Sequence, residues 1–110
     1  MNFGGIYVNK TLQKSSKFKK DFKQYKNDKK VCNELKTVIY YLDNDIPLPL
    51  KYCDHKLNGE YGNSRDCHLF PNIVLIYSCN GNTISLTRIG THNKLGLTET
   101  LHKLHIRESD

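Results

Sequence analysis

The chain has 110 residues, a net charge of +6 and a hydrophobic fraction of 37%, with four phenylalanines and seven tyrosines. This length supports one modest core, so a second domain is excluded and a single domain over residues 1–110 is expected. No apolar run approaches the roughly 20 residues of a membrane helix, and the N-terminus lacks the apolar segment of a secretory signal. We therefore expect a cytoplasmic protein with no membrane partner.

The first half of the chain predicts a strand followed by two helices. Residues 6–14 ("IYVNKTLQK") are expected to form the strand. Either Ser15 or Ser16 suits the N-cap of the first helix. Its apolar residues recur at helical spacing, namely Phe18, Phe22 and Tyr25.

A second helix is predicted to begin after Asn27 or Asp28 and to end before Pro47 and Pro49, which cannot continue it. Its apolar stripe consists of Val31, Leu35, Val38, Ile39 and Leu42. The two helices are short and adjacent in sequence. A helical hairpin is therefore expected.

The second half changes to the alternating pattern of strands. Three strands are predicted, over residues 65–70, 73–77 and 83–89. Asn80-Gly81 indicates a two-residue hairpin turn between the last two strands, because both turn positions would take a positive φ. The expected fold is α+β, with the helical hairpin packed on one face of a small, mainly antiparallel twisted sheet of about four strands. A further amphipathic helix is expected at about 97–106.

Basic residues are concentrated in the first third of the chain. Residues 1–36 hold ten lysines against three acidic residues, a balance of +7. Such asymmetry is typical of proteins that bind a polyanion or an acidic partner, although a solvated lysine face gives the same pattern. The four cysteines form no C-x-x-C pair, so we expect free thiols and no metal site.

Three histidines occur on segments that the predicted fold brings toward one face of the sheet, namely His55, His68 and His92. Imidazole titrates near neutral pH and suits both proton donation and proton acceptance. Residues two apart in an extended strand share a face, so Ile84, Leu86 and Arg88 face the same way. On the neighbouring strand His68 and Arg65 fall on opposite faces, so strand alternation alone does not tell whether an imidazole and a guanidinium point into one cleft.

Two segments, "YCDHKLNGEYGNSRDCHLFPNIVLIY" and "TRIGTHNKL", carry a resemblance to a known family. Their D-H-x-L, R-D-x-H and R-x-G-T-H motifs, over about residues 51–95, resemble the YafQ branch of the RelE toxin superfamily. The resemblance implies a RelE-like fold and a bacterial type II toxin that cleaves mRNA in the ribosomal A site. It also implies inhibition by a cognate antitoxin, with the ribosome and mRNA as the other partners, and neither metal nor cofactor.

The resemblance also assigns site residues. It implies His55, His68 and His92 as the catalytic set and Arg65 and Arg88 as phosphate ligands. We add as candidate RNA contacts a group of basic, polar and aromatic residues: Lys17, Lys20, Lys23, Lys51, Tyr61 and Asn72. Structural roles stay open for several of these, since Arg65 has Asp54 or Asp66 as ion-pair candidates and Tyr61 suits the core as well as base stacking.

The chain departs from the family pattern at four places. Asn72 stands where an acidic residue is common, Tyr61 replaces a tryptophan, Lys56 replaces a proline, and Gly96-Leu97 stand where an aromatic residue is usual. Because asparagine cannot act as a base, catalysis would depend more heavily on the histidines. Two rival functions stay open: a ParE-like inhibitor that binds DNA gyrase without catalysis, and an RNA-binding module with incidental histidines.

Overall fold

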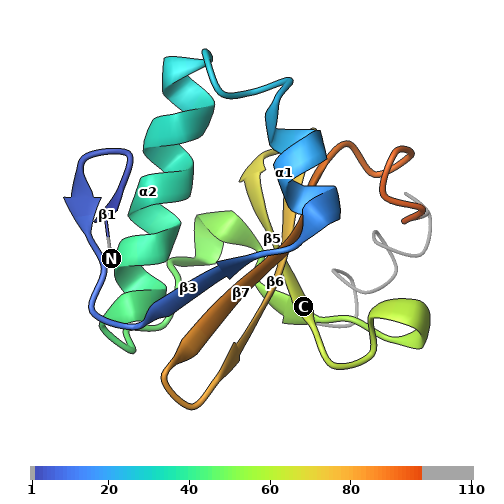
Figure 1. Cartoon of the computed structure of the whole chain (residues 1–110). Helices are drawn as coiled ribbons and strands as arrows, with labels where there is room; N and C mark the ends of the chain where they lie inside the picture. The colour runs from blue at the N-terminus through green and yellow to red at the C-terminus, as the bar shows by residue number, and fades with distance from the viewer. Residues whose placement is uncertain (1, 98–110) are drawn as a thin grey trace.

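A five-stranded sheet forms the centre of the protein, whose computed structural model describes residues 2–97 (Figure 1). The strand order is β3-β7-β6-β5-β4. The strands are β3 (Thr11–Lys14), β4 (His55–Lys56), β5 (Arg65–Phe70), β6 (Ile73–Asn80) and β7 (Thr83–Gly90). β3 runs parallel to β7, and the remaining neighbours are antiparallel. The predicted α+β class is confirmed, with five strands in the sheet where about four were expected.

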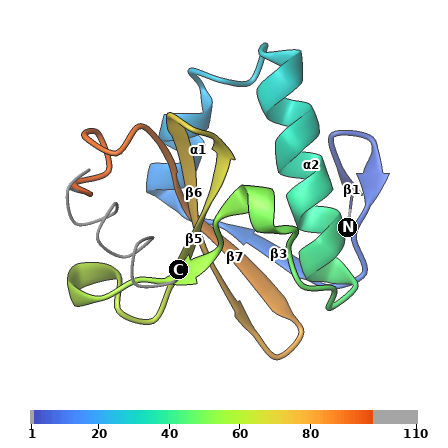
Figure 2. The ribbon, with the colours of Figure 1, turned by 180° about the vertical axis from the view of Figure 1, so that it is seen from behind.

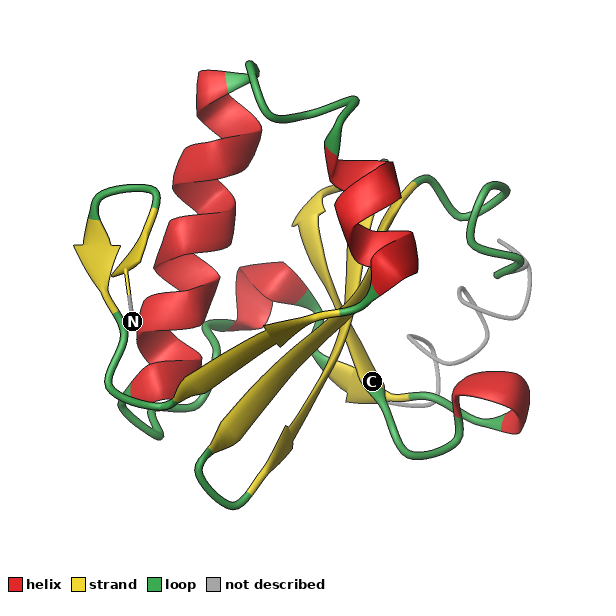
Figure 3. Ribbon diagram, in the orientation of Figure 1, coloured by secondary structure: helices red, strands yellow, loops and turns green. Residues whose placement is uncertain are grey.

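Both helices cover one face of this sheet (Figure 3), as the sequence predicts. α1 (Ser16–Phe22) is capped by Ser15, whose Oγ accepts a hydrogen bond from the Phe18 amide at 2.9 Å. The same hydroxyl donates to the Thr87 carbonyl of β7 at 2.7 Å. One side chain therefore both begins the helix and fixes it to the sheet.

α1 is shorter than expected because the amides after Phe22 bond to carbonyls only three residues back, including Tyr25 N–H to Phe22 at 2.9 Å. Tyr25 lies in the turn beyond the helix but is still buried. α2 (Lys29–Asp43) is capped by Asp28, whose carboxylate accepts from the Lys30 and Val31 amides. Its predicted apolar stripe is confirmed, with four side chains fully buried and Leu42 partly buried.

The expected strand over residues 6–14 is wrong as one element. Only Thr11–Lys14 joins the main sheet, while β2 (Ile6–Tyr7) pairs with β1 (Asn2–Phe3) in a separate hairpin beside α2. The break has a clear cause in Asp43 at the end of α2. Its carboxylate accepts hydrogen bonds from the amides of Asn9 at 3.0 Å and Lys10 at 2.8 Å, which fixes the backbone between the two strands.

The turn between β6 and β7 is displaced by one residue from the prediction. Asn80 still pairs with Thr83, so the two turn residues are Gly81 and Asn82. Gly81 has a φ of +59° and Asn82 is not in the left-handed region. Glycine at the first position is the pattern of a type II′ turn, in which only that residue needs a positive φ.

A bulge in β7 changes which residues face each side of the sheet. Tyr77 of β6 pairs with Leu86, but the preceding Ile76 pairs with Arg88, so Thr87 is the extra residue. Leu86 therefore faces the helices, whereas Arg88 faces the opposite side together with Ile76. The expectation that Leu86 and Arg88 share a face is wrong for this reason.

Figure 2 shows the molecule from behind. Within residues 2–97, the face of the sheet opposite the helices is covered only in part. A small second cluster packs there, consisting of Leu57, Val74, Ile76 and Leu95 with Tyr61 and Leu97 against it. The covering residues come from the segment just after β4, from the short helix η2 (Gly59–Tyr61) and from the loop after β7. A second short helix, η1 (Leu50–Tyr52), leads into β4 on the other side, where Tyr52 joins the main core.

No helix within residues 2–97 is long and apolar enough to cross a membrane. All four cysteines lie in this range and are free thiols. The helix expected at about 97–106 lies outside the described residues, apart from Leu97.

Candidate active site

Three imidazoles from distant segments gather on the partly open face of the sheet. His68 pairs with Val74 and Val74 with Gly90, so the side chain of His68 and the end of β7 lie on this face. His92 follows two residues after β7, and its ring meets that of His68 edge to face with centroids 5.3 Å apart. His55 on β4 pairs with Asp66, which shares the face of His68. The gathering expected from the sequence is present.

The loop after β7 fixes the position of His92 by local hydrogen bonds. The Thr91 hydroxyl accepts from the Lys94 amide at 3.2 Å, and the Thr91 carbonyl accepts from the Leu95 amide at 3.1 Å. The His92 carbonyl accepts from the Leu97 amide at 2.8 Å. A buried Leu95 then anchors this compact turn to the sheet, so His92 is held by backbone geometry as well as by its ring.

His68 is a neutral imidazole at physiological pH. Burial, followed by the neighbouring His92 and His55, lowers the pKa of His68 to about 4. A cationic ring is disfavoured in a half-buried site beside two other imidazoles. His68 therefore keeps a lone pair with which to accept a proton at pH 7.

His55 and Asp66 form a buried pair that needs a proton between them. The Cys53 carbonyl, 2.9 Å from His55 Nδ1, can only accept, so Nδ1 carries a hydrogen. On the other side of the ring, Nε2 lies 3.1 Å from Oδ1 of the fully buried Asp66. Burial, with a further contribution from Asp54, raises the pKa of Asp66 to about 7. A protonated Asp66 carboxyl that donates to Nε2 satisfies both groups.

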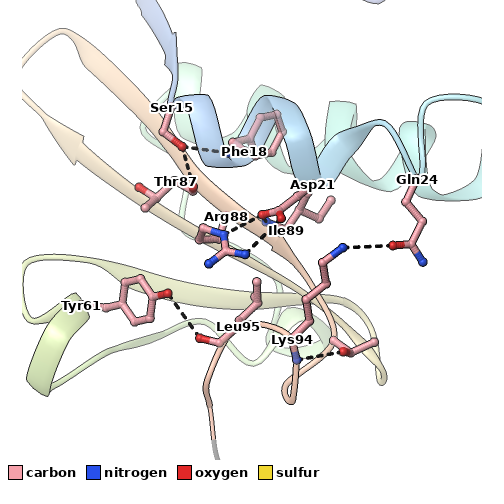
Figure 4. Close-up of polar contacts among 11 residues, drawn as sticks. Ser15, Phe18, Asp21, Gln24, Tyr61, Thr87, Arg88, Ile89, Lys94 and Leu95 are labelled. Atoms are coloured by element: carbon pink, nitrogen blue, oxygen red, sulfur yellow. Dashed lines mark hydrogen bonds and ion pairs between the residues drawn. The ribbon is translucent and has the colours of Figure 1, made fainter.

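Arg88 reaches this face through the bulge and is held there by Asp21 of α1 (Figure 4). The Asp21 carboxylate accepts from Arg88 Nε at 2.7 Å, from its Nη2 at 3.1 Å and from the Ile89 amide at 3.1 Å. Burial alone would raise the pKa of Asp21, but these hydrogen bonds and the arginine charge outweigh it and lower that pKa. The guanidinium is thus bidentate on one edge and directed toward Tyr61 on the other.

A pocket of about 520 Å³ adjoins Arg88. Three predicted RNA contacts line it from separate segments, namely Arg88, Tyr61 and Lys17. Tyr61 also donates a hydrogen bond to the Leu95 carbonyl at 3.3 Å and packs against the second cluster. Tyr61 therefore both packs against the second cluster and lines the pocket.

Arg65 is not brought to the histidines. It pairs with Tyr77 on the helix-covered face, where its guanidinium donates to both carboxylate oxygens of Asp54 at 3.1 to 3.3 Å. The Tyr77 hydroxyl donates to the same carboxylate. Of the two partners considered from the sequence, Asp54 is the one that the structure favours.

The remaining predicted RNA contacts lie on separate elements outside the histidine cluster. Asn72 is exposed in the β5–β6 turn, at the end of the sheet where His68 and Gly90 lie. Lys20 and Lys23 are exposed on α1 and just after it. Lys51 lies away from the histidines, where its Nζ is 3.7 Å from Glu34 of α2 and 5.0 Å from the Tyr52 ring centroid.

Sequence reasoning missed Asp21 and Asp66 as members of this site. Asp21 lies three residues after Phe18 and four before Tyr25, so its place on the buried side of α1 was readable from helical spacing. Asp66 is two residues before His68, and this spacing puts both on one face of β5. Within residues 2–97, no three His, Cys, Asp or Glu side chains are arranged to hold a metal ion.

Comparison with known proteins identifies the family of this chain. The family described as "Bacterial toxin of type II toxin-antitoxin system, YafQ" matches residues 10–97. The mRNA interferase toxin YafQ of Escherichia coli K12 is 34% identical over 89 residues, which cover 80% of this chain and 97% of that protein.

Two solved structures are similar over nearly their whole length. The E. coli DinJ-YafQ complex contains a chain with a TM-score of 0.69 and 34% identity, covering 79% of this chain and 98% of that one. A metal-bound toxin from Helicobacter pylori has a TM-score of 0.70 and 36% identity, covering 78% and 98%. Fold and sequence together define a toxin of a bacterial type II toxin–antitoxin system. Within that class, the chain belongs to the YafQ family.

Proposed function

We propose that this chain is an endoribonuclease that cleaves mRNA on the ribosome and uses His68 and His92 for the two proton transfers. The observation that carries the proposal is the convergence of His55, His68 and His92 on one partly open face beside Arg88. Membership of the YafQ family and the mRNA interferase activity named for the E. coli relative support it.

In the proposed reaction, the ribose 2′-OH attacks the adjacent phosphorus. Neutral His68 takes the 2′-OH proton, the new O2′–P bond closes a 2′,3′-cyclic phosphate, and the P–O5′ bond breaks. His92 in its protonated form gives a proton to the leaving 5′ oxygen.

Arg88 supplies positive charge to the phosphoryl oxygens as they gain charge in the transition state. Asp21 accepts hydrogen bonds from Nε and Nη2 of Arg88. The other edge of the guanidinium, which faces Tyr61, is therefore directed toward the pocket. Lys17 and Tyr61 would hold the flanking RNA in that pocket. His55 is a positioning residue, fixed between the Cys53 carbonyl and Asp66.

The exposed lysines of α1, with Lys51 as a more distant contact, would bind ribosomal RNA. Asn72 would contact the substrate from the β5–β6 turn. We also propose inhibition by a cognate antitoxin, because the E. coli relative has been crystallised with DinJ. A cytoplasmic location is proposed because the substrate is mRNA on translating ribosomes.

The test is to add the purified protein to translating ribosomes and to map new RNA ends. New ends that carry a 2′,3′-cyclic or 3′-phosphate are expected with the wild type. They are expected to disappear with His92→Ala but to persist with Asn82→Ala, a matched control in the exposed turn at the opposite end of β7. Intact RNA together with inhibited DNA gyrase would refute the proposal in favour of the ParE-like rival.

A further inference from the structure

A second basic pocket lies on the other side of the molecule from the histidines. It has a volume of about 680 Å³ and is enclosed by the β1–β2 hairpin, the end of β3 and the turn from α1 into α2. We call it the hairpin pocket. Its principal lining side chains are two aromatic rings and four lysines: Phe3, Phe22, Lys14, Lys26, Lys29 and Lys36.

The charge of the hairpin pocket is of one sign. Among the described residues, no aspartate or glutamate lines it, and the remaining side chains include three asparagines and Cys32. One of its lysines already lies close to an aromatic ring, since Lys14 Nζ is 5.4 Å from the Phe3 ring centroid. The Phe22 ring stacks on that of the buried Phe18, with centroids 5.6 Å apart, and so packs against the core.

The β1–β2 hairpin is what closes this pocket. Asn2, Phe3 and Gly4 form one side of it, and these residues lie before the segment matched by the YafQ family, which begins at residue 10. The opposite wall comes from α1 and α2, on the helix-covered face of the sheet. The family's matched residues therefore provide eight of the eleven lining residues, and the N-terminal hairpin of this chain provides the other three.

We propose that the hairpin pocket binds a nucleotide of a single RNA strand, as a second contact outside the active site. Lysines bind the phosphates, an aromatic ring stacks on the base, and asparagine amides offer both donors and acceptors to base edges. A volume of about 680 Å³ is within the range of small-ligand sites and accommodates one nucleotide with its phosphates. The two half-buried aromatic rings in the lining favour RNA over an acidic peptide, because a base can stack on a ring. The inference rests on the proposed function only in that RNA is taken as the polyanion that the toxin meets.

The absence of tryptophan from the chain gives a direct test. Phe3→Trp places a single tryptophan in the pocket, and its fluorescence reports stacking. The probe is a 2′-O-methyl oligoadenylate, which has no free 2′-OH and is not cleaved. Saturable quenching is expected. Tyr7→Trp is the matched control on the same hairpin, because Tyr7 is 74% exposed and does not line the hairpin pocket; little quenching is expected there.

A second measurement needs no tryptophan. Lys26→Glu/Lys29→Glu is expected to weaken binding of a fluorescently labelled oligoadenylate at least tenfold, as measured by anisotropy. It is also expected to reduce the slope of log K against log salt by about 1.4, since each lost phosphate contact to a single strand contributes about 0.7. Lys30→Glu/Lys56→Glu makes the same charge change at two exposed positions outside the pocket and is expected to weaken binding far less.

Equal weakening by both lysine pairs, or equal quenching of both tryptophans, would overturn the proposal. Polyglutamate serves as a second probe, for an acidic protein partner. If Lys26→Glu/Lys29→Glu lost polyglutamate binding but bound RNA as the wild type does, the proposal would be overturned in favour of that partner. Adding His92→Ala to Phe3→Trp is expected to leave quenching intact. Failure of the hairpin pocket is thus distinguishable from failure of the proposed nuclease, because the first is read by binding and the second by cleavage.

Discussion

Asp21→Asn tests whether the ion pair between α1 and Arg88 supports both the fold and the site. The Asp21 side chain is 4% exposed and that of Arg88 is 15% exposed, so water screens the pair weakly. Removing one partner of such a buried pair costs about 3–5 kcal/mol. Because asparagine keeps one acceptor oxygen and Arg88 retains some exposure, we expect a loss of about 2–4 kcal/mol in the free energy of unfolding at pH 7.

Urea unfolding followed by circular dichroism measures this loss, with an unchanged m-value as the sign that only stability has changed. The pKa of Asp21 is lowered in the folded protein, so its contribution is present above the unfolded pKa of about 3.9 and is lost as pH falls through the folded value. The difference between wild type and Asp21→Asn is therefore expected to shrink below about pH 4. Arg88→Met in the Asp21→Asn background is expected to restore part of the stability, because no unpaired cation is left. Equal urea midpoints at pH 7 for wild type and Asp21→Asn would refute the reasoning.

Three further predictions concern the histidines and the start of α1. His68→Gln is expected to lower the cleavage rate by about 10²–10⁴-fold while leaving the urea midpoint within error. An NMR titration of the wild type is expected to show the His68 ring neutral down to about pH 5, given its pKa of about 4. A titration midpoint near pH 6.5 for this ring would contradict the prediction. Asp66→Asn is expected to change stability at pH 6 by less than about 1 kcal/mol, because the amide can donate to His55 Nε2 as the protonated carboxyl does; a loss of about 3–5 kcal/mol would instead identify an ionised Asp66. Ser15→Ala is expected to lower the free energy of unfolding, measured with urea, by about 1–2 kcal/mol, since it removes both the helix cap and the hydrogen bond to Thr87. Ser16→Ala, at the exposed neighbouring position, is expected to lower it much less.

The elements of this fold were predictable where periodic burial determines them. The stripe from Val31 to Ile39 repeats at helical spacing, and residues 73–77 form an uninterrupted apolar run, so both were assigned correctly. The parallel position of β3 beside β7 was not predictable. It depends on contacts between residues about 70 positions apart, and four residues contain too little pattern to choose a neighbour.

The candidate site was predictable in its residue types but not in its orientation. Motif spacing selected His55, His68 and His92, and the structure brings them together. Whether Arg88 joins them depends on one inserted residue in β7, Thr87. A single-residue bulge reverses every side chain beyond it, and nothing in the alternating sequence "TISLTRI" marks the position where the alternation breaks.

The position of the bulge follows from what surrounds it. The Thr87 carbonyl accepts from the Ser15 hydroxyl, the Leu86 carbonyl accepts from the Ser15 amide, and Asp21 holds the Ile89 amide. α1 therefore supplies partners on both sides of the extra residue, and it buries Phe18 in the same core as Leu86 and Ile89. A regular β7 would place the Arg88 side chain among those apolar residues, at the cost of burying a charge without its carboxylate. The lysine-bearing helix and the arginine of the site are thus parts of one local structure, so a change that displaces α1 is expected to affect RNA cleavage as well as stability.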